Sequence, residues 1–490
     1  MKILLALPIA ALFASCASDQ DNPLVADSGF AMPAIEHCNT DLRYLNQVAG
    51  WQGAWPSRWQ GIVAAGPDNA DEFIEYWSSA SRALADSKAR LRQGVRREET
   101  APRAVVLRIH QQVADLSNEL SQTNSKYTFP NSDHENAQAW NKLIRKSVAP
   151  AVADFEAFLQ DEYLPEAQVS PSLSAIKGGE TCFANAVTWW TSLVISQDEI
   201  ERLGWKYINE TRAELVKTGS NGESLKAILS RLRQSEKNDE TTIDELLDVS
   251  ESALARAHAN TQLAFSKQAT HEIAVTKLPL HMQSSFPAGR YLAASEHAPA
   301  QYVINPSRPN ERRLMAEVIA FHEAIPGHHL WAAYPRDTPV EKYTSGLSGI
   351  TEGWAIYSEY VADEMGLYSS TYDRQGMMAK HLWAASRLVV EPGLHLRGWS
   401  REQAVSFMLE NTLMSRTEIE LEVDRYIAMP GQSLSYILGA NLLLSERQRA
   451  REQMGTAFDV RAFHDVVLAA GARPLPIVRD DIRKWSESNH

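Results

Sequence analysis

The sequence has 490 residues, which is long enough to bury a large core, and its apolar fraction of 44% and charged fraction of 22% are ordinary for a globular protein. The formal net charge is −13, and no run of Lys and Arg is dense enough to follow a phosphate backbone. The composition therefore argues against nucleic acid as a partner and otherwise indicates only a protein of enzyme size.

The first residues are typical of a bacterial export signal. Lys2 precedes an apolar segment that is too short to span a bilayer, and small residues follow it. The run LFASC at residues 12–16 resembles the lipobox of bacterial lipoproteins, in which the cysteine becomes the lipidated first residue. We expect a signal peptide over residues 1–15, lipidation of Cys16 and a flexible tether over residues 16–30. The expected location is the bacterial cell envelope, at the outer membrane or the periplasmic face, with the lipid anchor as the only membrane contact.

Two cysteines remain after Cys16, namely Cys38 and Cys182. In an oxidising compartment they either pair as a disulfide or stay as two separate buried thiols, and the sequence leaves both alternatives open. No other segment has about 18 consecutive apolar residues, so we expect no membrane-spanning helix in the body of the chain.

Helices dominate the expected secondary structure, because apolar residues recur at helical spacing in long segments, whereas alternating strand-like runs are few and short. This indicates a mainly α fold with a small β-sheet near the middle of the chain. We expect an N-terminal helical region over residues 31–270 and a chemistry-bearing region over residues 271–490, joined as one integrated unit. The expected helices include 71–93, 104–120, 140–159, 183–203 and 243–265, and the expected strands are 274–282, 300–304 and 475–478.

Three of the 14 histidines fall within the run HEAIPGHH that starts at His322. Apolar residues upstream repeat at helical spacing, so His322 is expected near the end of an amphipathic helix, with Asn310 as its N-cap. The run looks like a variant of HExxH, in which two histidines one turn apart hold zinc and the glutamate activates a water. The position four residues after His322, however, is Pro326, which cannot bind a metal.

Helix geometry limits the ways around this proline. On an unbroken helix, His328 would be rotated by about 240° from His322, and His329 would lie roughly 10 Å further along the same face. Pro326 and Gly327 predict that the helix is interrupted, and a two-residue bulge would return His328 to the place of the second ligand. The alternative is a histidine-rich helix end followed by a simple Pro-Gly turn, with no metal.

A second helix carries further acids. Glu352 lies 24 residues beyond His328, in the first turn of a helix that follows a glycine-containing loop, and Glu359 lies two turns along on nearly the same face. These acids could belong to a solvated face. The neighbouring residues 354–357 are apolar nearly all round, however, so the helix is expected to be buried, and a buried carboxylate needs a partner such as a metal.

These motifs carry a resemblance to a known family. HEAIPGHH followed by EGWAIYSE resembles the bacterial domain of unknown function 885 family, which is similar to the thermolysin-like, or gluzincin, zinc metallopeptidases. The stretches RLVVEPGLH at 387–395 and EVDRYIAMPGQ at 422–432 also match, and the resemblance runs from about residue 40 to the C-terminus. It departs from the expected pattern at Glu391-Pro392, where Asp-Thr is expected, and at Ile356, where thermolysin-type enzymes place a supporting acid.

The resemblance implies a multi-helix zincin-like metallopeptidase fold with the small sheet near the active site. On this interpretation His322, His328 and Glu352 hold zinc and leave one position for water. Glu323 takes the proton of the attacking water and passes it to the leaving amine. His329 is expected to pack against the site or support it, without binding the metal.

Three further residues are candidates for substrate contacts. His395 and Tyr426 lie on segments that the resemblance places near the site, where a donor would stabilise negative charge on the carbonyl oxygen. For Tyr426 the alternative is a packed core tyrosine. Arg425 either clamps a substrate carboxylate or only forms an ion pair with Glu422 and Asp424.

The expected function is therefore that of a zinc-dependent hydrolase, and among these a peptidase, with carboxypeptidase-like action included. Its substrate would be a peptide or a small amide. One alternative is a non-peptide amidase or esterase that uses the same zinc site. The other is a non-catalytic lipoprotein that serves as a binding module, in which nothing would require Glu323 beside the ligands.

Overall fold

The computed structural model describes residues 40–130, 133–219, 222–278, 288–294, 299–307, 309–336, 347–469 and 471–489. This part of the chain is mainly helical with one small sheet, which confirms the expectation of a mainly α fold with a small β-sheet. The strands are β1 (Ile273–Lys277), β2 (Gly289–Leu292) and β3 (Ala300–Ile304). The helices are α3 (Thr40–Arg43), α4 (Trp51–Ala65), α5 (Ala70–Trp77), α6 (Ala80–Arg96), α7 (Arg103–Ser121), α8 (Glu135–Leu143), α9 (Ala149–Phe158), α10 (Gly179–Thr191), α11 (Gln197–Lys217), α12 (Leu225–Lys237), α13 (Ile243–Asn260), α14 (Ala316–Glu323), α15 (His328–Ala333), α16 (Ser348–Glu364), α17 (Thr371–His395), α18 (Arg401–Asn411), α19 (Arg416–Ala428), α20 (Ser435–Met454), α21 (Val460–Ala469) and α22 (Leu475–Ser488).

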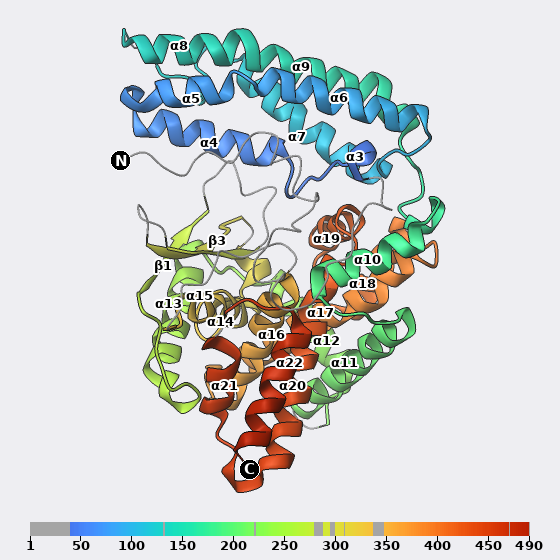
Figure 1. Cartoon of the computed structure of the whole chain (residues 1–490). Helices are drawn as coiled ribbons and strands as arrows, with labels where there is room; N and C mark the ends of the chain where they lie inside the picture. Colours follow the sequence, from blue (N-terminus) through green and yellow to red (C-terminus); the bar gives the residue numbers. More distant parts are fainter. Residues whose placement is uncertain are drawn as a thin grey trace.

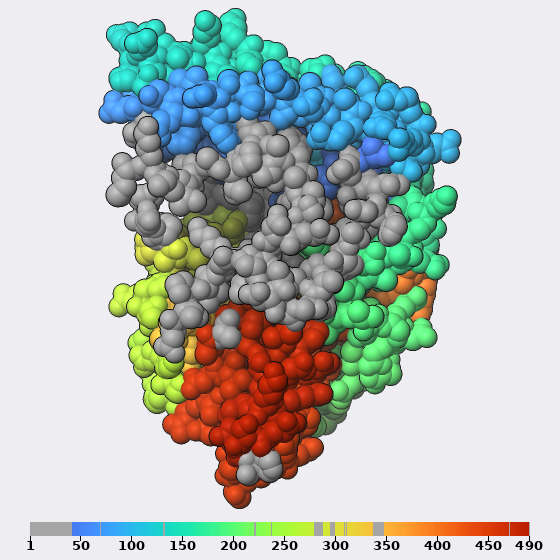
Figure 2. Space-filling view, in the orientation of Figure 1, coloured from blue at the N-terminus to red at the C-terminus, as the bar shows by residue number. Residues whose placement is uncertain are grey.

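The N-terminal helices form a layer of their own. Figure 1 shows α4 to α9 stacked across one end of the molecule, and in Figure 2 this layer and the C-terminal helices occupy opposite ends of the visible face. The layer has an aromatic core in which the rings of Trp55 and Trp59 lie 5.3 Å and 5.4 Å from that of Trp77. The same core continues into the rest of the chain through Val390 of α17 and Tyr426 of α19.

The second core holds the sheet and most of the remaining helices, whereas α18 and α19 pack into the first core. The second core includes α10 to α13 as well as α14 to α17 and α20 to α22. The two cores divide between Ala167 and Leu173, well before the expected boundary at residue 270. Helix α17 contributes to both, and α11 packs so closely along it that a Cβ on Gly204 would lie 2.9 Å from Leu388.

The sheet has the strand order β1-β3-β2. Strand β1 pairs in parallel with β3, from Ile273 opposite Ala300 to Lys277 opposite Ile304, and β2 pairs with β3 in the antiparallel sense. The expected strand 300–304 is confirmed as β3, whereas the strand expected at 274–282 ends at Lys277 within the described residues. Strand β2 was not expected, because it is short and its residues alternate poorly.

The strand expected at 475–478 is wrong, because these residues form the first turn of α22. Pro474 caps this helix and Pro476 follows at its start, a position where the missing N–H of proline costs no intrahelical hydrogen bond. The short apolar run was ambiguous between strand and buried helix. Asn310 is not the N-cap of α14 either, since it lies in a 3-10 turn and α14 begins only at Ala316.

Serine residues divide two of the expected helices. The segment 71–93 is α5 and α6, because Ser78 and Ser79 turn their hydroxyls back onto carbonyls of the preceding turn. The segment 183–203 is α10 and α11, since Ser192 adopts a positive φ of 54° and Ser196 caps the next helix. The expected helices at 104–120, 140–159 and 243–265 are present, the second of them with a π-helical turn between α8 and α9.

None of the helices in the described part of the chain is long and apolar enough to cross a membrane.

Three glycines allow two central helices, α16 and α20, to approach closely. A Cβ on Gly353 of α16 would lie 2.5 Å from the Cα of Gly439 of α20, and a Cβ on Gly439 would lie 1.9 Å from the carbonyl oxygen of Gly349. This contact fixes the first turns of α16 against α20, and both turns carry residues of the candidate site.

Candidate metal centre

The motif around Pro326 interrupts the helix as expected. Helix α14 ends at Glu323, Ala324 leaves the helical region with φ −116° and ψ −100°, and α15 begins at His328. The Ile325–Pro326 peptide bond is cis. Gly327 has no room for a side chain, because its Cβ would lie 1.9 Å from the carbonyl oxygen of His322. The bulge therefore folds the chain back onto the last turn of α14.

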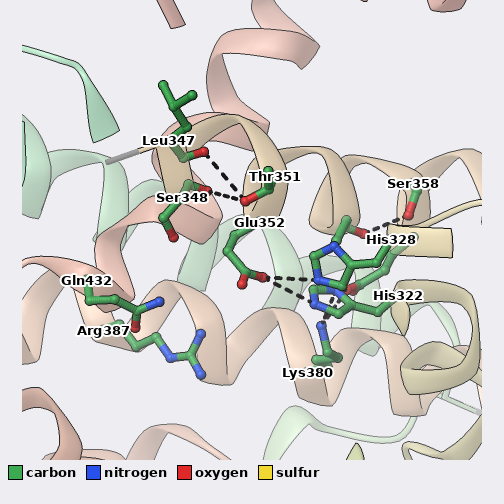
Figure 3. Close-up of polar contacts among 12 residues, drawn as sticks. His322, His328, Leu347, Ser348, Thr351, Glu352, Ser358, Lys380, Arg387 and Gln432 are labelled. Carbon is green, nitrogen blue, oxygen red and sulfur yellow. Dashed lines mark hydrogen bonds and ion pairs between the residues drawn. The ribbon is translucent and has the colours of Figure 1, made fainter. Parts of the chain in front are cut away.

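This bulge brings His322 and His328 together with Glu352 of α16. The Nε2 atoms of His322 and His328 lie 3.5 Å and 3.4 Å from Glu352 Oε2, and the two imidazole rings are 4.9 Å apart (Figure 3). The three candidate ligand atoms all lie within 4.8 Å of one another, so these three residues, the ligand group, could hold a metal ion. They are the three residues that the sequence predicted as ligands.

The environment of Glu352 fits a cation at this position. Its Oε2 is buried, and no described residue hydrogen-bonds to that atom. Burial raises the pKa of the Glu352 carboxyl, but the neighbouring imidazoles of His328 and His322 outweigh burial and hold the pKa well below its usual range. An ionised carboxylate oxygen beside two imidazole nitrogens is a donor set that suits a transition metal such as zinc.

Glu359 orients the first histidine. Its carboxylate is fully buried, with one oxygen 2.7 Å from His322 Nδ1 and the other 2.9 Å from His381 Nε2, and Lys380 donates to it as well. When Nδ1–H of His322 donates to Glu359, the Nε2 lone pair is free to face Glu352 and His328. Burial raises the pKa of Glu359, but the Lys380 ammonium and the histidine hydrogen bonds lower it well below its usual range.

Glu323 stands next to the site and outside the ligand group. It is the last residue of α14, directly after His322, and its side chain is half-buried. No described residue hydrogen-bonds to its carboxylate, and its charge interacts with Arg290 of β2. A carboxylate that neighbours a ligand and keeps its own lone pairs available can accept a proton.

His329 lies outside the ligand group, where it anchors the sheet. It is fully buried, with Nε2 2.9 Å from the carbonyl oxygen of His271, just before β1, and Nδ1 3.3 Å from the hydroxyl of Tyr291 in β2. Burial lowers the pKa of His329 to about 4, so the ring is neutral at neutral pH. These contacts fasten two strands of the sheet to α15.

The structure does not bring His395 or Tyr426 to the ligand group. His395 donates to the backbone oxygen of Tyr426 at 3.1 Å and packs on Phe183. It lies fifteen residues beyond Lys380 on α17, a separation of about 22 Å along a helix. Tyr426 is fully buried, and its hydroxyl accepts hydrogen bonds from Trp383 and Arg387 at 3.1 Å each, as in the packed-core alternative.

Arg425 takes part in an internal ion pair. Its Nη2 donates to Glu422 Oε2 at 2.7 Å and its Nε to Glu422 Oε1 at 3.2 Å, while Nη1 donates to Gln432. Asp424 pairs instead with Arg401, at 2.6 Å. The position of Arg425 therefore matches the ion-pair alternative, because its guanidinium already binds the carboxylate of Glu422.

Sequence reasoning missed four residues near the ligands. Lys380 and His381 contact Glu359, and the ring of Tyr436 in α20 lies 6.2 Å from that of His322 at an interplanar angle of 12°. Arg387 packs on the same tyrosine. The available signal was the presence of Lys380, His381 and Arg387 in the mostly apolar stretch 376–390 of α17, since a buried cation needs an anionic partner.

Glu391 replaces the aspartate expected from the family pattern and holds the loop before α20. It is fully buried and accepts hydrogen bonds from the backbone N–H of Gly431 and Ser433 and from the Ser433 hydroxyl. Burial raises its pKa to about 7. Cys182 is disulfide-bonded, whereas Cys38, its partner in the disulfide alternative, and the lipidation candidate Cys16 lie outside the described residues.

The fold resembles those of two solved bacterial proteins. A candidate lipoprotein from Colwellia psychrerythraea is 23% identical, with a TM-score of 0.75 over 86% of this chain and 76% of the other. A candidate lipoprotein of unknown function from Shewanella oneidensis is 16% identical, with a TM-score of 0.61 over 97% of this chain and 99% of the other. None of the curated proteins matches this chain. The model of the family described as bacterial protein of unknown function (DUF885) matches residues 17–482, and the protein belongs to this family.

Proposed function

We propose that the protein is a zinc-dependent hydrolase that cleaves peptide bonds. The observation that carries the proposal is the group of His322, His328 and Glu352, with the free carboxylate of Glu323 directly beside it. Two imidazoles and one carboxylate are the protein ligands of several catalytic zinc sites, which keep a further position open. The zincin-like arrangement implied by the family resemblance is part of this proposal.

Each residue then has a defined task. Bound zinc would polarise the substrate carbonyl and lower the pKa of a water molecule. Glu323 accepts the proton of the attacking water and returns it to the leaving amine. Glu359 keeps the His322 ring oriented, and Lys380 neutralises the charge of Glu359 within the buried cluster.

The position of strand β2 beside the ligand group favours a peptide as the substrate over other amides. Among the described residues, β2 pairs only with β3, so no other strand of this part of the chain lies along its second edge. The strand packs against α14, since a Cβ on Gly289 would lie 3.2 Å from Ile319, and Arg290 of the same strand interacts with the charge of Glu323. A peptide that adds to this edge by main-chain hydrogen bonds would pass beside the ligand group.

Purified protein is expected to contain close to one zinc per chain and to cleave members of an unbiased peptide library. Elemental analysis and mass spectrometry of the digest measure the two quantities. A chelator should abolish cleavage and added zinc should restore it. Cleavage of amide or ester substrates without peptide cleavage would replace the peptidase assignment by the amidase alternative. Protein that binds no zinc and hydrolyses nothing would contradict the whole proposal.

We also propose that the protein is anchored at the cell envelope through Cys16. The lipobox-like run at residues 12–16 supports this, and both solved proteins of similar fold are described as candidate lipoproteins. Mass spectrometry of protein from membranes is expected to find a mature N-terminus at Cys16 that carries a diacylglyceryl group. Cys16→Ser should remain unprocessed or be released, and an unmodified N-terminus elsewhere would contradict the anchor.

A further inference from the structure

Arg387 lies on the side of α17 that faces the ligand group. It follows Lys380 by seven residues, about two helical turns, so the two side chains project from the same face. Figure 3 shows Arg387 and Gln432 on the side of Glu352 away from the two histidines. The side chain of Arg387 is 4% exposed. A buried cation is therefore placed beside the site and is not used by the proposed chemistry.

A stack of planar groups holds this guanidinium and links it to the ligands. Its central carbon lies 4.3 Å from the Trp383 ring and 4.4 Å from the Tyr436 ring, and Tyr436 in turn lies nearly parallel to His322. Stacking between two aromatic faces orients the plane of an arginine and limits its rotamers. The fork of Arg387 therefore points in a fixed direction relative to His322.

The internal partners of Arg387 leave part of its charge uncompensated. Arg387 and Arg425 both donate to the same oxygen of Glu422, at 3.2 Å and 2.7 Å. Burial raises the pKa of Glu422, but the charges of Arg425 and Arg387 outweigh burial and lower it to about 2, so it carries one negative charge. The nearby Glu391 makes its hydrogen bonds with the loop before α20. Two cations, of which Arg387 is buried and Arg425 half-buried, thus share one carboxylate, which favours the binding of a further anion.

Two donors in this region have no acceptor among the described residues. Arg387 uses Nε for Tyr426 and Nη2 for Glu422, which leaves Nη1. Gln432 accepts from Arg425 through Oε1, which leaves its Nε2 amide group. A carboxylate has two oxygens that accept from such neighbouring N–H groups.

We propose that Arg387 and Gln432 bind the C-terminal carboxylate of the peptide substrate, so that the hydrolase releases short C-terminal fragments. This inference rests on the proposed function. Because Tyr436 lies 4.4 Å from the Arg387 guanidinium and 6.2 Å from His322, at most about three extended residues separate the carboxylate site from the ligands. The expected products are therefore one to three residues long. The sequence suggested Arg425 as the residue that binds a substrate carboxylate, but the guanidinium of Arg425 already donates to both carboxylate oxygens of Glu422.

The test measures binding without turnover. Two N-acetylated tetrapeptide libraries with randomised side chains, one with free C-terminal carboxylates and one with amides, are dialysed to equilibrium against the zinc-loaded Glu323→Gln variant. Free acids are expected to bind about 10- to 100-fold more tightly, the usual contribution of a charge-assisted hydrogen bond. Arg387→Met in the same background should remove this difference while zinc content stays unchanged. Arg374→Met, which removes another arginine of α17, one that pairs with Asp363 of α16, should keep the difference.

Equal binding of acids and amides by Glu323→Gln, including no binding of either, would overturn the carboxylate site. Other outcomes distinguish a failure of the carboxylate site from a failure of the proposed hydrolase function. If wild-type protein cleaves amidated peptides as fast as free acids, the hydrolase stands and the carboxylate site falls. If it cleaves nothing while the preference for free acids persists and depends on Arg387, the carboxylate site stands and the hydrolase falls.

Discussion

Glu323→Gln is expected to retain close to one zinc per chain and to lose at least about 10²-fold in kcat/KM, the usual contribution of a general base. Glutamine keeps the size of the side chain but cannot accept the proton of the attacking water. Because no described residue hydrogen-bonds to the Glu323 carboxylate, the change should leave packing intact. Zinc content by elemental analysis and initial rates on a cleaved peptide measure the two effects.

A second acid of the chain offers a matched control. Glu272 is an exposed acid just before β1, and Glu272→Gln should behave as wild type. Glu323→Asp keeps the carboxylate but withdraws it by one methylene, so its rate is expected to fall between those of wild type and Glu323→Gln. Full activity in Glu323→Gln would contradict the assigned role. Loss of zinc would instead mean that Glu323 belongs to the ligand group.

The grouping of His322, His328 and Glu352 could be predicted from the sequence because helix geometry left few ways around Pro326 and because the resemblance to zincins points to an acid on the following helix. Pro326 and Gly327 required an interruption, and the buried character of α16 required a partner for Glu352. Both constraints are local, since one acts within the HEAIPGHH run and the other within a single helix. For the same reason Glu359, two turns beyond Glu352, could be recognised as a neighbour of the site.

The residues around the ligands could not be predicted, because their positions depend on contacts between distant helices. Tyr436 reaches His322 only because Gly353 and Gly439 let α16 and α20 approach, and no spacing rule reveals such a contact. Arg387 reaches the same tyrosine from a third helix, α17. His395 was placed near the site on the strength of its segment, but a helix of 25 residues extends far beyond any single site.

The most severe losses of zinc are expected from His322→Ala, His328→Ala and Glu352→Ala, each of which should leave the protein essentially free of metal. Each substitution removes one of the three proposed protein ligands. Elemental analysis after dialysis against zinc at fixed concentrations measures the loss. Circular dichroism of the same samples separates loss of zinc from loss of fold.

Two neighbouring substitutions serve as controls and decide between the histidines of the HEAIPGHH run. His329→Ala should retain zinc, because both ring nitrogens of His329 already make hydrogen bonds, one with the carbonyl oxygen of His271 and the other with the hydroxyl of Tyr291. Glu359→Gln removes the carboxylate that orients His322 and should weaken zinc binding by about 10- to 100-fold without abolishing it. If His329→Ala loses zinc while His328→Ala keeps it, the metal lies on the other side of α15. The bulge at Pro326 would then have a purpose other than returning His328 to His322.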